Sequence, residues 1–367
     1  MSGPPRILIV TAAFGEGHNS AARNLALAMD EMGCTSLVAD PCSLGAPRLT
    51  ARVCKAYRLA TNYFPRAWGA IYRATDLCDF SRPRAPLMGP PERALAELVG
   101  DFQPDAVVST FPLYPYFLPR LFEKVGKKLP VFTIITDSIE INAAWLRSPT
   151  DFWLVTDRYT RESMIAKGLP AAKIVETGFP VNPDFSRTSA LPSSAPCEPF
   201  RILYFPTAKR SLLASHCRAL LDASPATLLT LVLGRNVRLL ASRAQEIQRD
   251  YPGRVRLVGW TRRVPELLTR HHVVVGKAGG ATVHEAIAAT CPMLIHHLVP
   301  GQEEGNLRLL ETIGGGRLAQ TPAALHEEIV KMLAHEATGW RSMKSTLIHH
   351  DKNAGAITAG KFILGQL

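Results

Sequence analysis

Short apolar runs rich in β-branched residues alternate with longer stretches of helical character along the first half of the chain. The first run, at residues 6–10, precedes a glycine-containing turn and an alanine- and leucine-rich segment at residues 18–32. Further strand candidates lie at residues 106–110, 131–136, 152–156 and 174–178. Continuously apolar runs are typical of strands buried on both faces of a parallel sheet. The pattern predicts an α/β domain.

The second half repeats this alternation after a serine- and proline-rich stretch at residues 186–199, which is typical of a linker. Its strand candidates occupy residues 201–205, 228–233, 255–260, 273–277 and 293–297. We therefore expect two doubly wound, Rossmann-like α/β domains that face each other across a cleft. The predicted domains are residues 1–185 and 200–344, and the tail from about residue 345 to 367 could pack back onto the first domain. Ligands of such folds bind beyond the carboxyl ends of the strands.

Composition narrows the class of protein. The chain has 367 residues and 47% hydrophobic residues, enough for a sizeable core, and its formal net charge of +11 points to an anionic partner. No apolar run is long enough to span a bilayer, and no leader-like segment precedes residue 6. Seven scattered cysteines without metal-finger or redox spacing favour a reducing compartment, so we expect a cytoplasmic protein.

The most informative residues follow two predicted strands of the second half, in GKAGGATVHEA at residues 276–286 and VPGQEEGN at residues 299–306. Gly279 and Gly280 permit close backbone approach, and Thr282 can cap the helix that begins there. Free N–H groups of a helix start suit a diphosphate, and Lys277 can add a full positive charge. Glu285 is a candidate for binding ribose hydroxyls, although it could also be an ordinary solvated helix glutamate.

These two motifs, at this spacing, resemble the donor-binding half of the family 28 glycosyltransferases, most closely the monogalactosyldiacylglycerol synthase and processive diacylglycerol glucosyltransferase group. The resemblance extends over most of the chain. It implies a two-domain GT-B fold, a UDP-sugar co-substrate, inversion at the anomeric carbon, and no metal or other cofactor. It also implies donor-binding roles for further residues at the turns: Gly234, Arg235, Asn236, Gly259, Trp260, Gly301, Gln302, Glu303 and Asn306. Gln302 and Glu303 would contact the sugar, and Asn306 would hold the PGQE turn, whereas a capped helix start is the alternative reading of residues 302–304.

The turn after the first strand, TAAFGEGH at residues 11–18, matches the Gly-x-Gly-His turn of the same family through Gly15, Gly17 and His18, with Phe14 beside it. A base near the reacting hydroxyl is valuable because a neutral alcohol is a weak nucleophile. We predict that His18 is this base, although a lone histidine at a helix start is more often a cap or surface group. Ala13 replaces an aspartate of the plant-type enzymes, so the bacterial glucosyltransferase pattern fits better.

A third segment, ITDSIEINAAW at residues 135–145, resembles a Thr-Asp…His…Trp stretch of the family through Asp137 and Trp145, with Asn142 in place of the histidine. Asp137 could hold the acceptor or orient His18, or it could merely cap the following segment. The substitution at Asn142 leaves the acceptor less defined than the donor. GFPVNPDF at residues 178–185 also matches the family, and we expect a structural role there.

The segment from residue 48 to 84 is basic and aromatic. Eight basic residues (Arg48, Arg52, Lys55, Arg58, Arg66, Arg73, Arg82, Arg84) stand against Asp76 and Asp79, a net charge of +6, interleaved with Tyr57, Tyr63, Phe64, Trp68, Tyr72 and Phe80. This mixture is typical of a surface that binds an anionic membrane. A solvated helix packed through its aromatic face is the alternative. Nucleic-acid binding ranks lower because no nucleic-acid module accompanies the charge.

We thus expect an inverting, metal-independent hexosyltransferase that moves a sugar from a UDP-sugar to diacylglycerol or another lipid, peripherally associated with the inner face of the cell membrane. The sequence contains no Asp-x-Asp pair, the motif that often binds the metal ion in metal-dependent transferases. A transferase acting on a polyprenyl-linked or soluble acceptor is the first alternative. A non-catalytic UDP-sugar sensor is the second, and a sugar-nucleotide epimerase would differ by releasing no glycosylated product. The sequence does not define the sugar or the number of sugars added.

Overall fold

The computed structural model describes residues 3–78, 88–350 and 352–367. Internal contacts divide the chain into two compact units. The first comprises Met1–Pro183, Pro300–Gly305 and Ala354–Leu367, and the second comprises Asp184–Val299 and Asn306–Asn353. The short segment Pro300–Gly305 therefore packs with the first unit although both of its neighbours in sequence belong to the second.

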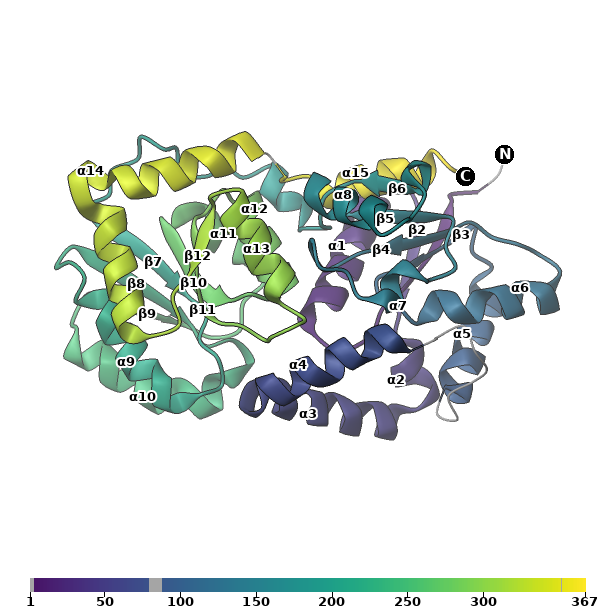
Figure 1. Cartoon of the computed structure of the whole chain (residues 1–367), viewed down its shortest axis with the longest axis horizontal. Helices are drawn as coiled ribbons and strands as arrows, with labels where there is room; N and C mark the ends of the chain where they lie inside the picture. Colours follow the sequence, from purple (N-terminus) through teal and green to yellow (C-terminus); the bar gives the residue numbers. More distant parts are fainter. Residues whose placement is uncertain (1–2, 79–87, 351) are drawn as a thin grey trace. The chain divides into compact units, whose positions relative to one another are not determined.

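The first unit is a six-stranded parallel sheet in the order β2-β1-β3-β4-β5-β6, with helices on both faces (Figure 1). The strands are β1 (Arg6–Val10), β2 (Thr35–Ala39), β3 (Ala106–Ser109), β4 (Val131–Ile134), β5 (Phe152–Val155) and β6 (Ile174–Glu176). Its α-helices are α1 (Glu16–Glu31), α2 (Pro41–Gly45), α3 (Pro47–Tyr63), α4 (Pro65–Ala74), α5 (Gly89–Phe102), α6 (Leu118–Val125), α7 (Ala143–Leu146), α8 (Arg158–Ala166) and α15 (Gly355–Leu364). Short 3-10 helices η1 (Thr75–Leu77), η2 (Tyr114–Phe117) and η3 (Ala171–Lys173) complete it.

The second unit has the same architecture, with strand order β12-β11-β10-β7-β8-β9. Its strands are β7 (Phe200–Tyr204), β8 (Thr227–Val232), β9 (Val255–Val258), β10 (Val273–Lys277), β11 (Met293–His297) and β12 (Gly316–Leu318). Its α-helices are α9 (Arg210–Leu221), α10 (Val237–Asp250), α11 (Val264–Arg270), α12 (Gly280–Ala288), α13 (Glu304–Thr312) and α14 (Pro322–His350), the last interrupted at residues 334–337. Two 3-10 helices, η4 (Pro183–Ser186) and η5 (Gly234–Asn236), lie beside them.

The predicted α/β architecture is confirmed, and every strand candidate is a strand of one of the two sheets, shortened at its carboxyl end by up to two residues. The edge strands β2 and β12 were missed. β2 is only partly buried along most of its length and β12 has three residues with two exposed, so neither forms the continuous apolar run that marks a central strand.

The linker region and the tail of the chain both have defined packing contacts. The stretch at residues 186–199 packs on the second unit, where Leu191 N–H donates to the Thr269 carbonyl. At the other end of the chain, α15 packs against α1, and Gly355 lies so close to Phe179 that a Cβ there would be 1.9 Å from the Phe179 carbonyl oxygen. The GFPVNPDF segment thus has structural contacts, and the tail beyond residue 354 belongs with the first unit.

Candidate active site

The carboxyl ends of β1, β3 and β4 bring together side chains that are far apart in the sequence of the first unit. His18 opens α1 after β1, Phe111 follows β3, and Thr136 follows β4. The Thr136 hydroxyl lies 3.0 Å from His18 Nδ1, and the Phe111 ring meets the imidazole edge-on at 5.4 Å. The imidazole is therefore held by one polar and one aromatic contact, with its Nε2 atom on the other side of the ring.

Asp137 and Trp145 complete this cluster. The indole Nε1 of Trp145 donates to Asp137 Oδ2 over 3.0 Å, and the indole ring lies 5.8 Å from the imidazole of His18. Trp145 is buried, whereas Asp137 is partly exposed. Asp137 does not cap the following helix, because Asn142 is the N-cap residue of α7.

Removal from water shifts the acid–base behaviour of both groups. Desolvation lowers the pKa of His18 to about 4, so its imidazole is neutral at physiological pH. Desolvation also raises the pKa of Asp137 to about 6, against the hydrogen bond from Trp145 and with help from the negative charge of Glu303. A neutral imidazole can accept a proton, and a carboxyl group titrating near pH 6 is typical of functional sites.

The loop between β4 and α7 holds Asp137 through a rare backbone conformation. Ile139 has φ 56, which is unfavourable for a β-branched residue. Its N–H donates to the Thr160 hydroxyl over 2.9 Å, and its carbonyl accepts from the Ser163 hydroxyl over 2.6 Å. Such strain persists where surrounding contacts enforce it, and it is commonly found at functional sites.

The Pro300–Gly305 turn lies against this loop. Gly305 is so close that a Cβ would be 1.8 Å from the Ser138 carbonyl oxygen, which excludes any other residue without backbone movement. Glu303 is buried and lies near enough to Asp137 to raise its pKa. Gln302 Oε1 accepts from the Tyr57 hydroxyl and from Trp68 Nε1, each over 3.1 Å. The first unit thus orients both side chains that the sequence assigned to sugar binding.

The remaining predicted residues of the first unit surround the cluster. Phe14 stacks on Phe111 at 5.6 Å, and Gly15 precedes α1 without a side-chain cap, with Gly17 inside the first turn. The Asn142 side chain accepts from Ala144 N–H and donates to the Thr75 hydroxyl over 3.0 Å. Asn142 therefore joins α7 to η1, which is a structural task.

In the second unit, the predicted donor residues lie at the carboxyl ends of β8, β9 and β10. Lys277 ends β10 at a bulge in its pairing with β11, and Gly279 is the N-cap residue of α12, where no side chain caps the helix. Gly280, Thr282 and Glu285 lie in the first turns of that helix. An uncapped helix start leaves backbone N–H groups facing outward, which suits a phosphate group.

Two further groups belong to this edge. Asn306 is buried, and its amide donates to the Ala278 carbonyl over 3.0 Å, so it holds the KAGG turn; its predicted effect on the PGQE turn stays a prediction. Gly234, with φ 56, opens η5 with Arg235 and Asn236, and Leu233 N–H donates to the Val258 carbonyl over 2.8 Å. Gly259 and the exposed Trp260 follow β9 directly, beside that turn.

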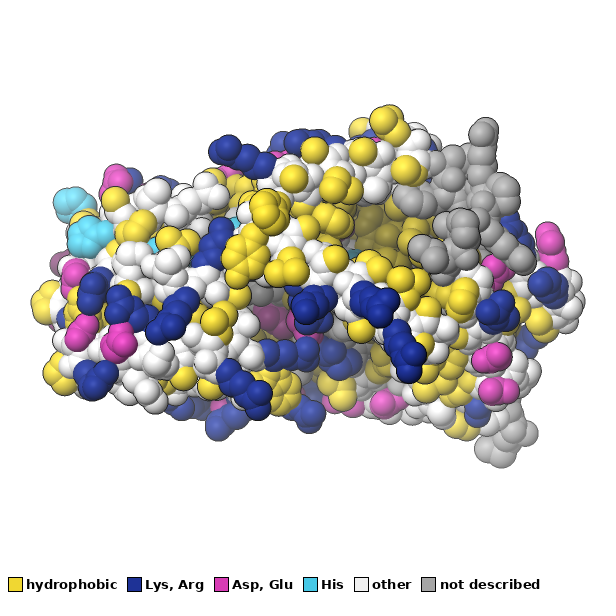
Figure 2. Space-filling view, turned by 90° about the horizontal axis from the view of Figure 1, so that it is seen from below, with side chains coloured by type: hydrophobic (Ala, Val, Ile, Leu, Met, Phe, Trp, Pro, Cys, Tyr) yellow, Lys and Arg dark blue, Asp and Glu magenta, His cyan; other side chains and the backbone are white. Residues whose placement is uncertain are grey.

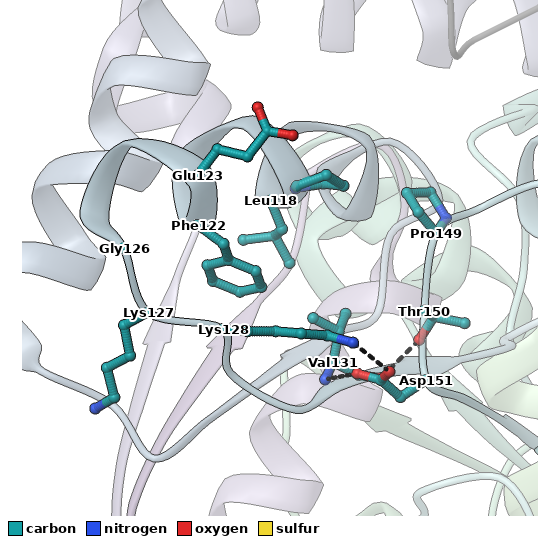
Figure 3. A pocket seen from close by; sticks show the side chains of 11 residues that line it. Leu118, Phe122, Glu123, Gly126, Lys127, Lys128, Val131, Pro149, Thr150 and Asp151 are labelled. Carbon is teal, nitrogen blue, oxygen red and sulfur yellow. Dashed lines mark hydrogen bonds and ion pairs between the residues drawn. The ribbon is translucent and has the colours of Figure 1, made fainter.

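A cavity of about 600 Å³ in the first unit lies away from these residues (Figure 3). It is lined by residues of α6 and by residues that precede or begin β4 and β5, among them Lys128, Val131 and Asp151. Lys128 Nζ lies 3.6 Å from Asp151 Oδ1, and Asp151 also accepts from Val131 N–H. This is the amino edge of the sheet, whereas ligands of such folds bind at the carboxyl edge.

Sequence reasoning missed the partners that orient the site: Tyr57, Trp68, Phe111 and Thr136. Phe111 and Thr136 follow strand ends, so the rule that placed His18 and Asp137 could also have pointed to them. The composition of their segment predicts that Tyr57 and Trp68 belong to a membrane-binding surface. No local signal pairs them with Gln302, which lies more than two hundred residues away.

Comparison with known proteins defines the class. Residues 18–181 match the family model of monogalactosyldiacylglycerol (MGDG) synthase. The processive diacylglycerol β-glucosyltransferase of Bacillus subtilis (strain 168) is 23% identical over 97% of this chain and 94% of the relative. The protein of the same name from Bacillus thuringiensis (strain Al Hakam) is 25% identical over 91% of this chain and 89% of the relative.

Solved structures match almost the whole chain. The kitacinnamycin glycotransferase superposes with a TM-score of 0.64 at 16% identity over 99% of both chains. MurG of Acinetobacter baumannii gives the same TM-score at 14% identity over 99% of this chain and 100% of its own. These structures show that the fold is GT-B. Together with the relatives above, they make the chain a hexosyltransferase. The resemblance seen in the sequence is confirmed: the chain is similar to the monogalactosyldiacylglycerol synthases over residues 18–181 and to the processive diacylglycerol glucosyltransferases over most of its length.

Proposed function

We propose that the protein transfers a hexose from a UDP-sugar to the hydroxyl group of diacylglycerol, with inversion and without a metal ion. The names of the relatives support diacylglycerol as acceptor. The paired environment of His18 and Asp137 carries the catalytic part of the proposal, because it combines a neutral base with a polar neighbour at the carboxyl edge of a sheet.

The donor half of the reaction is assigned to the second unit. The uncapped start of α12 and the ammonium group of Lys277 would stabilise the diphosphate, which carries more negative charge as it leaves. A helix terminus contributes about half a positive charge, so the lysine is the larger contributor. These groups would take the role that a divalent cation has in metal-dependent transferases.

The acceptor half is assigned to the first unit. The alcohol oxygen attacks the anomeric carbon as the bond from that carbon to the phosphate oxygen breaks, and UDP leaves with the electron pair. The proton of the alcohol passes to His18 Nε2, because Nδ1 is engaged by Thr136. Attack from the face opposite the leaving group inverts the anomeric carbon.

A membrane-binding surface on α3 and α4 would give access to a lipid acceptor. Tyr63 and Phe64, where the two helices meet, are 57% and 68% exposed, and Leu59 and Ile71 are exposed beside them. Arg52, Lys55, Arg58 and Arg66 are exposed on the same helices. Figure 2 shows hydrophobic and basic side chains interspersed on the face of the molecule that carries these helices. Exposed aromatic rings among basic residues suit an anionic bilayer surface.

The aromatic residues of the basic segment divide into two sets. Tyr57 and Trp68 bind Gln302, whereas Tyr63 and Phe64 are exposed. Phe80, Arg82, Arg84 and Asp79 lie outside the described residues. Among the described residues, no helix is both long enough and apolar enough to cross a bilayer. Attachment through α3 and α4 would be peripheral.

The decisive experiment supplies the purified protein with a panel of UDP-sugars and with liposomes that contain diacylglycerol, and identifies the lipid product by mass spectrometry. We expect one hexosyl lipid of inverted configuration, formed equally well after treatment with a chelator. His18→Ala serves as the catalytic control. A product on a polyprenyl or soluble acceptor would replace the acceptor assignment, and UDP binding without any turnover would favour a sensor.

A further inference from the structure

A second polar hollow lies in the second unit, on the face of β8 and β9 beside α11. Its volume is about 1020 Å³, and we call it the β8–β9 hollow. α9 and α10 pack on the opposite face of these strands, and α11 packs on β7 and α12. Among the helices that the structure describes, none packs extensively on the other face of β8 and β9.

Residues of both strands line this hollow. The side chains of Leu228, Thr230 and Arg256 alternate with those of Leu229, Leu231 and Val255, which belong to the hydrophobic core on the α9–α10 side. Leu229 and Val255 also border the hollow beside Leu228, Thr230 and Arg256. Thr230 pairs with Arg256 of β9, and Leu228 pairs with Arg201 of β7. The strands β7 and β9, which carry these two arginines, are two strand spacings apart, about 10 Å at the backbone.

Positive charge dominates the lining. Five arginines contribute to it, and Glu266 is its single acidic residue, already paired with Arg263. Arg254 donates to the carbonyls of Leu221, Ser224 and Thr227, and Arg201 Nε donates to the Arg270 carbonyl over 2.8 Å. Within the described part of the chain, the guanidinium groups of Arg256 and Arg270 have neither a hydrogen bond nor an ion pair.

The floor of the hollow is neutral. His271 Nδ1 donates to the Leu267 carbonyl over 2.6 Å, so Nε2 must accept the bond from the Thr230 hydroxyl over 2.8 Å. Burial and the charges of Arg201 and Arg256 lower the pKa of His271 to about 4. The arginines therefore supply the field of the hollow, and its concave shape concentrates that field at one place.

We propose that the β8–β9 hollow is an anion-binding site for a phosphate-bearing ligand, bound by Arg256 and Arg270 and separate from the donor diphosphate position at α12. Guanidinium groups bind phosphate oxygens in bidentate geometry, as in phosphomonoesters and diphosphates. Arg256 of β9 and Arg270 at the end of α11 both line the hollow from exposed positions. Val258, Trp260 and Thr261 also line the hollow, so its occupant borders the loop after β9 whose Gly259 and Trp260 are predicted to bind the donor.

The test measures binding of inorganic pyrophosphate by calorimetry in the presence of saturating UDP, which keeps the donor position occupied. We expect one pyrophosphate per chain, with an affinity that falls at higher salt. The double variant Arg256→Glu, Arg270→Glu should weaken pyrophosphate binding by at least about tenfold while UDP affinity is retained. The double variant Arg249→Glu, Lys361→Glu changes the net charge equally, at exposed positions outside the lining, and should bind pyrophosphate like the wild type.

A second arm separates the two sources of such a ligand. Flotation with vesicles containing phosphatidic acid is compared with flotation with neutral phosphatidylcholine vesicles. If pyrophosphate competes with the acidic vesicles, and this competition is lost in Arg256→Glu, Arg270→Glu, the ligand is a lipid headgroup. If pyrophosphate binds without such competition, the ligand is a soluble phosphate compound. The proposal is overturned if pyrophosphate does not bind beside UDP or if both double variants lose binding alike. If the charge reversal prevents folding, the double variant Arg256→Gln, Arg270→Gln repeats the test. If the wild-type protein does not bind UDP, that result counts against the proposed transferase function and not against the anion-binding site.

Discussion

Trp145 Nε1 donates a hydrogen bond to Asp137 Oδ2 over 3.0 Å, while the same indole lies 5.8 Å from the imidazole of His18. Asp137 therefore acts on its surroundings through a buried tryptophan, and no direct bond joins the carboxylate to the histidine among the contacts of the described residues. The charge state of Asp137 and the position of His18 are coupled by packing, which makes the pair accessible to pH measurements.

The first prediction concerns the pH dependence of kcat/KM. If the ionised form of Asp137 is needed, activity is fully present above its pKa and declines as pH falls through about 6, and protonation of His18 adds a second decline near 4. Asp137→Asn should remove the upper transition and leave the lower one. Trp145→Phe removes the bond that lowers the pKa of Asp137, so the upper transition should move to higher pH. An unchanged transition near pH 6 in Asp137→Asn would refute this assignment.

The second prediction concerns His18 as the base. His18→Ala should lower kcat by roughly 10²- to 10⁴-fold, the usual contribution of general base catalysis, with UDP affinity retained. Initial rates and calorimetry on the same preparations measure both quantities. His349→Ala, at an exposed position of α14, is the matched control. Equal turnover in His18→Ala and the control would exclude the proposed base.

The third prediction concerns the orientation of Gln302. Tyr57→Phe removes the hydroxyl that donates to Gln302 Oε1 and accepts from Gln302 Nε2, and it leaves the ring in place. A lost hydrogen bond is worth about 1 kcal/mol, so the KM for the UDP-sugar should rise roughly fivefold or more while the affinity for UDP alone stays the same. Tyr63→Phe is the control, because Tyr63 is exposed. A parallel loss of UDP affinity would show that Tyr57 supports the fold and not the sugar position.

The fourth prediction concerns the α3–α4 surface. Phe64→Asp places a charge at the most exposed aromatic ring of this surface and should lower binding to anionic vesicles by about tenfold, with catalysis on a short-chain soluble diacylglycerol unchanged. Vesicle flotation and activity assays measure the two effects. Leu239→Asp, at an exposed position of α10 in the second unit, is the control for the added charge. If both variants bind vesicles like the wild type, the surface does not anchor the protein.

The fifth prediction concerns acid stability of the second unit. Burial lowers the pKa of His271 and His272 to about 4 and that of His296 to about 3. Between these values and 6.5 the unfolded chain binds more protons than the native chain, so the free energy of unfolding must fall as pH falls. Three such groups give a slope of up to about 4 kcal/mol per pH unit.

Hydrogen exchange of β7, β10 and β11 between pH 7 and pH 4.5 measures that slope. His296→Gln should reduce it by about one proton. A slope of zero in the wild type would mean that these histidines are protonated in the native state.

The sequence by itself determined the two α/β series, the catalytic histidine candidate and the donor turns. The reason is local: a continuous apolar run such as that of β10 is typical of a central strand of a parallel sheet, and Gly279 and Gly280 shortly after it form the start of the next helix. Edge strands carry less of this signal, which is why β2 and β12 were not recognised. The basic, aromatic segment was recognised by composition alone, and composition does not distinguish the ring of Tyr57 from that of Tyr63.

Tertiary structure decided which of these residues meet. The turn containing Gln302 and Glu303 packs with the first unit, beside Asp137 and the aromatic residues of α3 and α4, because Gly305 allows backbone contact with Ser138. The pKa of Asp137 depends on burial and on the carboxylate of Glu303, which lies 166 residues further along the chain. The amide of Asn142 likewise donates to the hydroxyl of Thr75, 67 residues earlier in the chain. Such properties arise from contacts between distant segments, and no local pattern encodes them.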